Sequence, residues 1–432
     1  MRILFVVHGY PPQGMGGVEL RASYLARELR KAHTVSVFCR GNNASREDYS
    51  VEDLLIDEVE VRRVSYSFRD LDRFEGVYVN RRIEALFEKT LDEVRPDVVH
   101  IHHLTCLSTT IPEVLRRKGV PHVMSLHDFW MGCPRGQRIR SDLATCHTID
   151  REKCLPCTEE IWGREMMRGK EPKGLLGRLL GQSDPQAILR DYDAHIRRIL
   201  GLPDLLLTPS VFSRDRFVEQ GVAADRIRVL PYGLPTRLFQ GIRRQKDTVL
   251  RFGYVGSVLP TKGAHVLLEA FEGLDRENVR LDIYGEVVPY HGDSSYVEEL
   301  RARIAKTPGV KMHGRYENAD LPRILEKVDI LVVPSVWFET FCITVREGFL
   351  AGIPVIASDI GAVAESIEDG VSGLLFRPGD SGDLREKMRR LVDDPELRLL
   401  LAGQASRVKT IEDNTRELVE IYREVRRPGR VR

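Results

Sequence analysis

The sequence has no long hydrophobic run, almost no excess charge and few cysteines. No apolar run reaches the length of about 18 residues that a membrane-spanning helix needs, and residues 3–7 are predicted to form a strand, not a signal sequence. The formal net charge is +1, which gives no indication of nucleic acid as a partner. Seven cysteines, an odd number, fit reduced thiols better than a disulfide framework. We therefore expect the protein to stay in the cytoplasm.

The 432 residues suit two α/β domains, each large enough to bury its own core. Short apolar strands alternate with helices in both halves, which is typical of parallel sheets. We predict an N-terminal domain over residues 1–235, with an insertion at about 130–180, and a C-terminal domain over 236–410. A helix within 411–432 has an apolar stripe that needs a partner surface.

The stretch Ile330–Asp359 shows the strand, loop, helix, strand pattern most clearly. Glu339 lies where a strand ends, and Glu347 lies about one turn inside the following helix, with seven residues between them. In parallel sheets ligands bind beyond the carboxyl ends of strands, where helix N-termini attract anions. Two carboxylates at this edge can accept hydrogen bonds from vicinal hydroxyls while backbone amides hold a phosphate. A nucleotide sugar has both features.

These residues resemble the donor-binding signature of glycosyltransferase family 4, in the segment ETFCITVRE and the AGIPVIASDIGAVAESIEDGVSGLLF that follows its helix. The resemblance covers nearly the whole chain. It implies the GT-B fold, in which two Rossmann-like domains face each other across a cleft and the C-terminal helix crosses back to the first domain. It also implies transfer of a sugar, with retention, from a nucleoside diphosphate sugar to a glycan or lipid-linked acceptor, without a catalytic metal or other cofactor.

The resemblance assigns roles residue by residue. Glu347 would bind the ribose, Glu339 the hydroxyls of the donor sugar, and Lys262 the diphosphate. The catalytic residues it implies are His127, at the donor C6 hydroxyl, with Lys262 and Glu339. The donor-binding residues it implies are Gly16, Gly17, Ser257, Lys262, Glu339, Thr340, Phe341, Cys342, Ile343 and Glu347.

Three positions depart from the family pattern. Thr340 and Cys342 stand where glycines are usual, and Ser257 stands where a second phosphate-binding arginine is usual. These departures keep open a non-catalytic homologue that acts as a scaffold. A sugar-nucleotide epimerase or phosphorylase on the same fold also stays open, because a fold does not fix the chemistry. The N-terminal glycine loop also suggests a dinucleotide enzyme, but its glycines do not form the GxGxxG pattern and the second strand is not followed by an acidic residue.

The insertion has its own chemistry. Cys133, Cys146, Cys154 and Cys157 could bind a structural zinc ion through four thiolates, or they are buried free thiols. The segment 161–181 mixes large apolar residues with lysines and arginines, which suits either peripheral contact with the inner membrane face or a solvated cover over the acceptor site. The donor base and sugar, the acceptor and the oligomeric state do not follow from the sequence.

Overall fold

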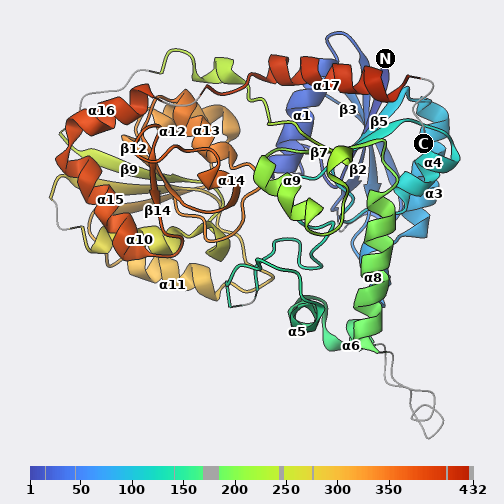
Figure 1. The fold of residues 1–432 in the computed structure, drawn as a ribbon, viewed down its shortest axis with the longest axis horizontal. Helices are drawn as coiled ribbons and strands as arrows, with labels where there is room; N and C mark the ends of the chain where they lie inside the picture. Colours follow the sequence, from blue (N-terminus) through green and yellow to red (C-terminus); the bar gives the residue numbers. More distant parts are fainter. Residues whose placement is uncertain are drawn as a thin grey trace, which may run out of the picture. The chain divides into compact units, whose positions relative to one another are not determined.

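A computed structural model of the chain describes residues 1–14, 16–43, 45–140, 142–168, 184–242, 248–274, 277–404 and 407–427. The chain divides into two compact units, drawn as ribbons in Figure 1. Unit 1 consists of residues 1–137, 147–233 and 411–432, and unit 2 of residues 138–146 and 234–410. Both are built from strands and helices that alternate along the chain.

Unit 1 contains a sheet of eight strands within the described residues, in the order β3-β4-β2-β1-β5-β6-β7-β8. Among these strands only β3 runs antiparallel to its neighbour, β4. Buried apolar residues fill β1 on nearly every position, as a parallel strand covered on both faces requires. The strands are β1 (Arg2–Val7), β2 (Thr34–Gly41), β3 (Val51–Ile56), β4 (Val59–Ser65), β5 (Val98–Ile101), β6 (His122–Ser125), β7 (Leu205–Thr208) and β8 (Ile227–Val229).

Helices connect most of these strands, as parallel pairing demands. Asn80 caps α3 by accepting hydrogen bonds from the first-turn amides of Arg82 and Ile83, which fixes where that helix begins. The helices of unit 1 are α1 (Gly17–Leu29), α2 (Glu75–Tyr78), α3 (Arg81–Val94), α4 (Ile111–Arg117), α5 (Arg151–Trp162), α6 (Arg164–Arg168), α8 (Pro185–Leu200), α9 (Val211–Val218), the short 3-10 helix η1 (Ala224–Arg226) and α17 (Ile411–Val425).

The C-terminal helix α17 packs on unit 1, beside α1 (Figure 1). Its apolar stripe, including Leu418 and Tyr422, joins the core around β1. The hydroxyl group of Tyr422 is 2.6 Å from Nδ1 of His100 on β5, and Asn414 accepts a hydrogen bond from buried Arg21 on α1 at 3.1 Å. The return of the last helix to the first unit, predicted from the resemblance, is therefore confirmed.

Unit 2 contains a parallel sheet of six strands in the part of the chain that the structure describes, in the order β11-β10-β9-β12-β13-β14. The strands are β9 (Leu250–Val255), β10 (Val279–Tyr284), β11 (Val310–Gly314), β12 (Ile330–Val333), β13 (Val355–Ser358) and β14 (Leu374–Phe376). The helices are η2 (Thr236–Phe239), η3 (Pro260–Lys262), α10 (Ala264–Glu272), α11 (Ser295–Ile304), η4 (Asn318–Asp320), α12 (Leu321–Leu325), α13 (Ile343–Leu350), α14 (Gly361–Ala364), α15 (Ser381–Asp393) and α16 (Pro395–Gly403).

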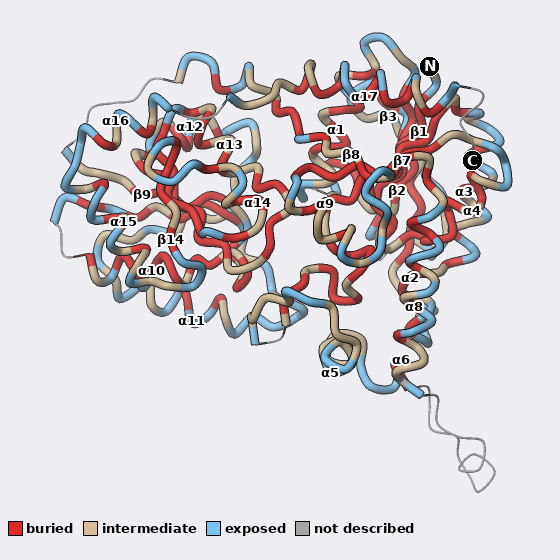
Figure 2. The backbone as a smooth tube through the Cα atoms, in the orientation of Figure 1, coloured by how far each residue is buried: buried red, intermediate tan, exposed pale blue. Residues whose placement is uncertain are grey.

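The cores lie on the faces of the two sheets. Figure 2 shows most of the strands buried and much of the helices' outer sides exposed. In unit 2 one apolar cluster includes Leu267 of α10 and Met388 of α15, and a second includes Val345 of α13. Both sheets are thus covered on two faces, which leaves the ends of the strands as the places where polar groups can collect.

Candidate functional site

The order of the strands locates a switch point in each sheet. In unit 2 the chain continues from β9 to β10 and β11 on one side, whereas β12 lies on the other side of β9 and leads to β13 and β14. The loops that follow β9 and β12 therefore diverge at one edge of the sheet, which is where open α/β sheets bind ligands. Lys262 lies in the first of these loops and Glu339 in the second.

Lys262 and Glu339 are in direct contact. Nζ of Lys262 donates to Oε1 of Glu339 at 2.6 Å, and the same oxygen accepts from Oγ of Ser335 at 3.0 Å and Nε1 of Trp337 at 2.9 Å. Burial alone would lower the pKa of Lys262, but the carboxylate raises it above its ordinary value, so the ammonium stays charged. Three donors on one oxygen fix the carboxylate and leave Oε2 as its accessible acceptor.

Gly263 allows the two loops to approach each other. Its φ angle is 72°, and a Cβ atom there would lie 1.9 Å from the carbonyl oxygen of Pro334, at the end of β12. The amide of Val336 donates to the carbonyl of Thr261 at 2.9 Å across the same contact. Because any side chain at position 263 would collide with backbone, glycine is required to bring Lys262 to Glu339.

Glu347 lies on α13 and is half-buried. Its side chain makes no hydrogen bond or ion pair with any described residue. Burial raises the pKa of Glu347 from 4.5 to about 7. A partly desolvated carboxylate without a protein donor is a group that a ligand's hydroxyls can satisfy.

The residues before α13 hold a strained turn. Cys342, the N-cap of α13, has a φ angle of 56°, a conformation that favours glycine. Its thiol is buried, which raises its pKa to about 12, so the group is neutral. Arg346 donates to the carbonyls of Phe341 and Cys342 and lies 3.7 Å from the centre of the Phe341 ring. These contacts fix the start of α13, where the amide of Ile343 points out of the helix end.

Two other predicted donor residues are placed as follows. Ser257 is exposed at the end of β9, and its carbonyl accepts a hydrogen bond from the hydroxyl of Tyr254 at 2.7 Å. Thr340 is half-buried in the loop after β12. Unit 2 thus carries Lys262 and Glu339 in contact, with Glu347 on the helix that follows the same loop.

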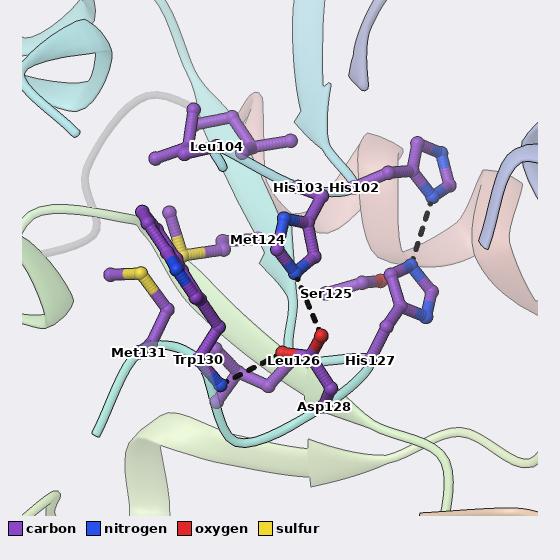
Figure 3. Close-up of a pocket in the computed structure, with 11 residues that line it drawn as sticks. His102, His103, Leu104, Met124, Ser125, Leu126, His127, Asp128, Trp130 and Met131 are labelled. Carbon is purple, nitrogen blue, oxygen red and sulfur yellow. Dashed lines mark hydrogen bonds and ion pairs between the residues drawn. The ribbon is translucent and has the colours of Figure 1, made fainter. Parts of the chain in front are cut away.

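His127 belongs to unit 1, where it follows β6 and is 5% exposed. Its Nε2 lies 3.1 Å from Nδ1 of His102 (Figure 3). Its Nδ1 is hydrogen-bonded to the hydroxyl of Tyr232. Burial holds the pKa of His127 well below its usual range, so the ring is neutral. Both ring nitrogens are therefore used inside the protein, and the neighbouring Asp128 is the more exposed of the two side chains.

Gly16 and Gly17 begin α1. A Cβ atom on Gly16 would lie 2.6 Å from Oε2 of Glu19, so the loop leaves room for this carboxylate. Oε1 of Glu19 is 3.1 Å from Nε2 of His8, at the end of β1. Sequence reasoning named neither His8 nor Glu19, although a histidine that ends the first buried strand was a detectable signal.

Within the described residues, none of the cysteines of the insertion forms a disulfide bond. Cys133, Cys154 and Cys157 belong to unit 1, and Cys146 belongs to unit 2. Within the described ranges, no three histidine, cysteine, aspartate or glutamate side chains are grouped so as to hold a metal ion. The zinc site therefore gains no support from the structure and stays a prediction.

The segment 161–181, considered for membrane contact, lies outside the described residues from position 169 onward. Its first part forms the end of α5 and α6. Searching the described helices finds none that is long and apolar enough to cross a membrane.

Comparison with sequence families gives two matches that divide the chain. The family described as "Glycosyltransferase Family 4" matches residues 15–238, and the family described as "Glycosyl transferases group 1" matches residues 239–407. The first of these covers more than half of the chain.

Several curated proteins are similar in sequence. An MMP alpha-(1->4)-mannosyltransferase of Mycolicibacterium hassiacum is 25% identical over 321 residues, which are 74% of this chain and 67% of the relative. The sulfoquinovosyl transferase SQD2 of Arabidopsis thaliana is 27% identical over 229 residues, which are 50% of this chain and 42% of the relative. An uncharacterised glycosyltransferase of Methanocaldococcus jannaschii is 24% identical over 98% of each chain. The chain thus matches less than half of one of these relatives.

Solved structures with the same fold cover almost the whole chain. HepE of Anabaena in complex with UDP-glucose has a TM-score of 0.69 at 18% identity, over 98% of this chain and 100% of that one. Sucrose-phosphate synthase of Thermosynechococcus elongatus has a TM-score of 0.70 at 17% identity, over 98% of each chain. Together with the two parallel sheets, these neighbours confirm the predicted GT-B fold class.

Proposed function

This chain belongs to glycosyltransferase family 4, and from that premise we propose that it transfers a sugar from a nucleoside diphosphate sugar to a hydroxyl of a glycan or lipid-linked acceptor, with retention. The observation that carries the proposal is the contact between Lys262 and Glu339 at the switch point of unit 2. On the adjoining helix lies Glu347, whose side chain has no partner among the described residues. HepE, which has a similar fold, was solved in complex with UDP-glucose, and this supports a nucleotide sugar as donor.

Each group has a chemical task in this proposal. The free oxygen of Glu339 accepts hydrogen bonds from hydroxyls of the donor sugar, and Glu347 accepts them from the ribose. Lys262 turns its charge toward the diphosphate, whose negative charge grows as the bond to the sugar breaks. The amides at the start of α13 add a positive dipole end for the same phosphates.

We infer retention from the family, and the two carboxylates bear on how it would occur. A covalent intermediate requires a carboxylate nucleophile opposite the leaving group. In our proposal both glutamates bind the donor itself, so neither is free to act as that nucleophile. In the mechanism that the family implies, the acceptor hydroxyl attacks on the face that the diphosphate leaves, and its proton passes to a phosphate oxygen of the leaving group. The bond from the sugar to phosphate breaks as the bond to the acceptor oxygen forms.

Our reason for expecting no catalytic metal is that Lys262 and the start of α13 supply the positive charge that a metal would otherwise provide.

Binding and stereochemistry test the proposal. The full chain is titrated by calorimetry with uridine, guanosine and adenosine diphosphate sugars, and the anomeric configuration of the product made from the best donor is read by NMR. We expect one nucleotide to bind and the product to keep the donor's configuration. A chain that binds none of the nucleotide sugars, or a product with inverted configuration, would contradict the proposal.

A further inference from the structure

Four polar side chains form two neighbouring carboxylate–histidine pairs in unit 1. His8, Glu19, His103 and Asp128 make up this two-pair cluster. Oε1 of Glu19 is 3.1 Å from Nε2 of His8, and Oδ2 of Asp128 is 3.1 Å from Nε2 of His103. The rings of His8 and His103 lie 4.7 Å apart between their centres. The pairs are therefore joined through their imidazole rings.

The cluster lies at the switch point of the unit 1 sheet. β1 and β5 are neighbours in that sheet, although β2 continues from β1 on the opposite side. His8 follows β1, His103 follows β5, and Asp128 follows β6, which is the next strand along. All three lie beyond the carboxyl ends of parallel strands, where this class of sheet binds its ligands.

Asp128 is held in a fixed orientation. The amide of Thr105 donates to Nδ1 of His103 at 3.1 Å, so Nε2 is the ring nitrogen that donates to Oδ2 of Asp128. The other carboxylate oxygen accepts from the amide of Trp130 at 2.8 Å. Burial acts to raise the pKa of Asp128, but His103 and these hydrogen bonds lower it below its usual value. The carboxylate is thus ionised, and each oxygen keeps capacity to accept another hydrogen bond.

Glu19 is enclosed by its own loop and cannot take the same role. Cβ atoms on Gly9, Gly14 and Gly16 would lie 3.2, 3.0 and 2.6 Å from its side chain. The side chain of Glu19 is 13% exposed, whereas that of Asp128 is 36% exposed. Glu19 therefore holds His8 against His103, and Asp128 is the member of the cluster that a ligand can reach.

A small cavity lies beside Asp128. It has a volume of about 10 Å³, and its lining includes His103, Asp128, Trp130 and Met131. Figure 3 shows the bond from His103 to Asp128 and the indole of Trp130 next to it. Space for about one water molecule next to an ionised carboxylate suits a small donor group such as a hydroxyl.

We propose that Asp128 binds a hydroxyl group of the acceptor and selects acceptors that are uncharged around that hydroxyl. The inference rests on the proposed function and specifies the acceptor side of it. Within the described parts of the chain, neither Asp128 nor Glu19 forms an ion pair with lysine or arginine. The two carboxylates, without such cations beside them, repel a phosphate group, while a hydroxyl of the acceptor can donate to Asp128.

The test uses the full chain and the nucleotide sugar found by the donor titration. Transfer is measured to octyl glycosides of glucose, galactose, mannose and N-acetylglucosamine, each compared with its 6-phosphate. We expect the wild type to prefer the neutral member of the best pair. Asp128→Asn keeps the shape of the side chain but removes the charge, and it should lower kcat/KM for the neutral acceptor by about 10- to 100-fold. The loss should lie in the acceptor KM while nucleotide affinity is unchanged.

His103→Gln tests the positioning of Asp128. It should weaken acceptor binding in the same direction, and the double variant with Asp128→Asn should lose little more than Asp128→Asn alone, because both changes affect one hydrogen bond. Asp92→Asn is the matched control and should leave transfer unchanged. Asp92 lies on the exposed side of α3, where its carboxylate pairs with Lys118.

Two groups of results overturn the inference while leaving the proposed function intact. The first group concerns a wild-type chain that binds the nucleotide sugar: it prefers the phosphorylated acceptors, or it transfers to none of the neutral glycosides. The other is an acceptor KM of Asp128→Asn equal to that of the wild type. Failure of the wild type to bind any nucleotide sugar is a different result, because it removes the proposed function itself.

Discussion

Replacing Glu347 by glutamine is expected to stabilise the protein at pH 8 and to weaken nucleotide binding at the same time. The side chain of Glu347 is half-buried on α13 and has no partner among the described residues. Glutamine has the same shape and no charge. The substitution therefore removes a desolvation penalty from the folded protein and a charged acceptor from the proposed ribose site.

The sign and size of the stability effect follow from the pKa of Glu347. Burial raises it from 4.5 in the unfolded chain to about 7 in the folded one, so the folded state binds the proton more tightly. Stability is therefore gained as the pH falls from above 7 toward 4.5. The full difference corresponds to about 3 kcal/mol of unfolding free energy above pH 7. Because the carboxylate still reaches solvent, we expect about 1–2 kcal/mol from Glu347→Gln at pH 8.

Two measurements check this prediction. Urea unfolding at pH 8 and pH 5 should show the stabilisation at pH 8 only, because at pH 5 the wild-type carboxyl is already protonated. Calorimetry at pH 8 should show nucleotide binding weakened by about 1.5–3 kcal/mol, the size of one charge-assisted hydrogen bond. Exposed Glu298 on α11 provides the control Glu298→Gln, which should change neither quantity. Equal stabilisation at both pH values, or unchanged nucleotide affinity, would refute the reasoning.

Three further substitutions probe unit 2. Glu339→Gln should leave the affinity for the free nucleoside diphosphate unchanged and weaken binding of the nucleotide sugar; equal losses for both ligands in calorimetry would contradict the assignment. Lys262→Ala should lower kcat more than donor affinity, because diphosphate charge grows in the transition state, and unchanged turnover would mean that the lysine only holds Glu339. Ser257→Arg places a second cation at an exposed loop position and should strengthen nucleotide binding by about 1 kcal/mol. A loss of nucleotide affinity in this variant would contradict the proposal that the diphosphate binds near this loop.

Much of the fold follows from local sequence patterns. Some features depend only on neighbouring residues, so they can be recognised without a structure. They are the apolar strands, Gly352 just after α13, and the apolar stripe on α17. The segment from β12 to β13 also carried the family resemblance, and the comparisons confirm it. The family relationship and the two parallel sheets were therefore predictable.

The site is less predictable because its contacts join residues far apart in the sequence. The prediction for His127 considered the ring alone, whereas in the structure His102 and Tyr232 occupy both of its nitrogens. The prediction for Gly16 and Gly17 named them as donor-binding residues, whereas Gly16 also leaves room for Glu19. Neither partner is visible from the spacing of residues.

The sequence by itself determined the family, the fold class and which loops follow which strands, because these depend on apolar periodicity and on a contiguous signature. Only the tertiary structure decided that Lys262 contacts Glu339 across 77 positions, that His103 orients Asp128 across 25, and that Glu347 has no partner in the described part of the chain. The physical reason is that the order and register of the strands set which loops meet at the edge of a sheet. The contacts between these loops then determine the hydrogen-bond partners and the charge of each side chain.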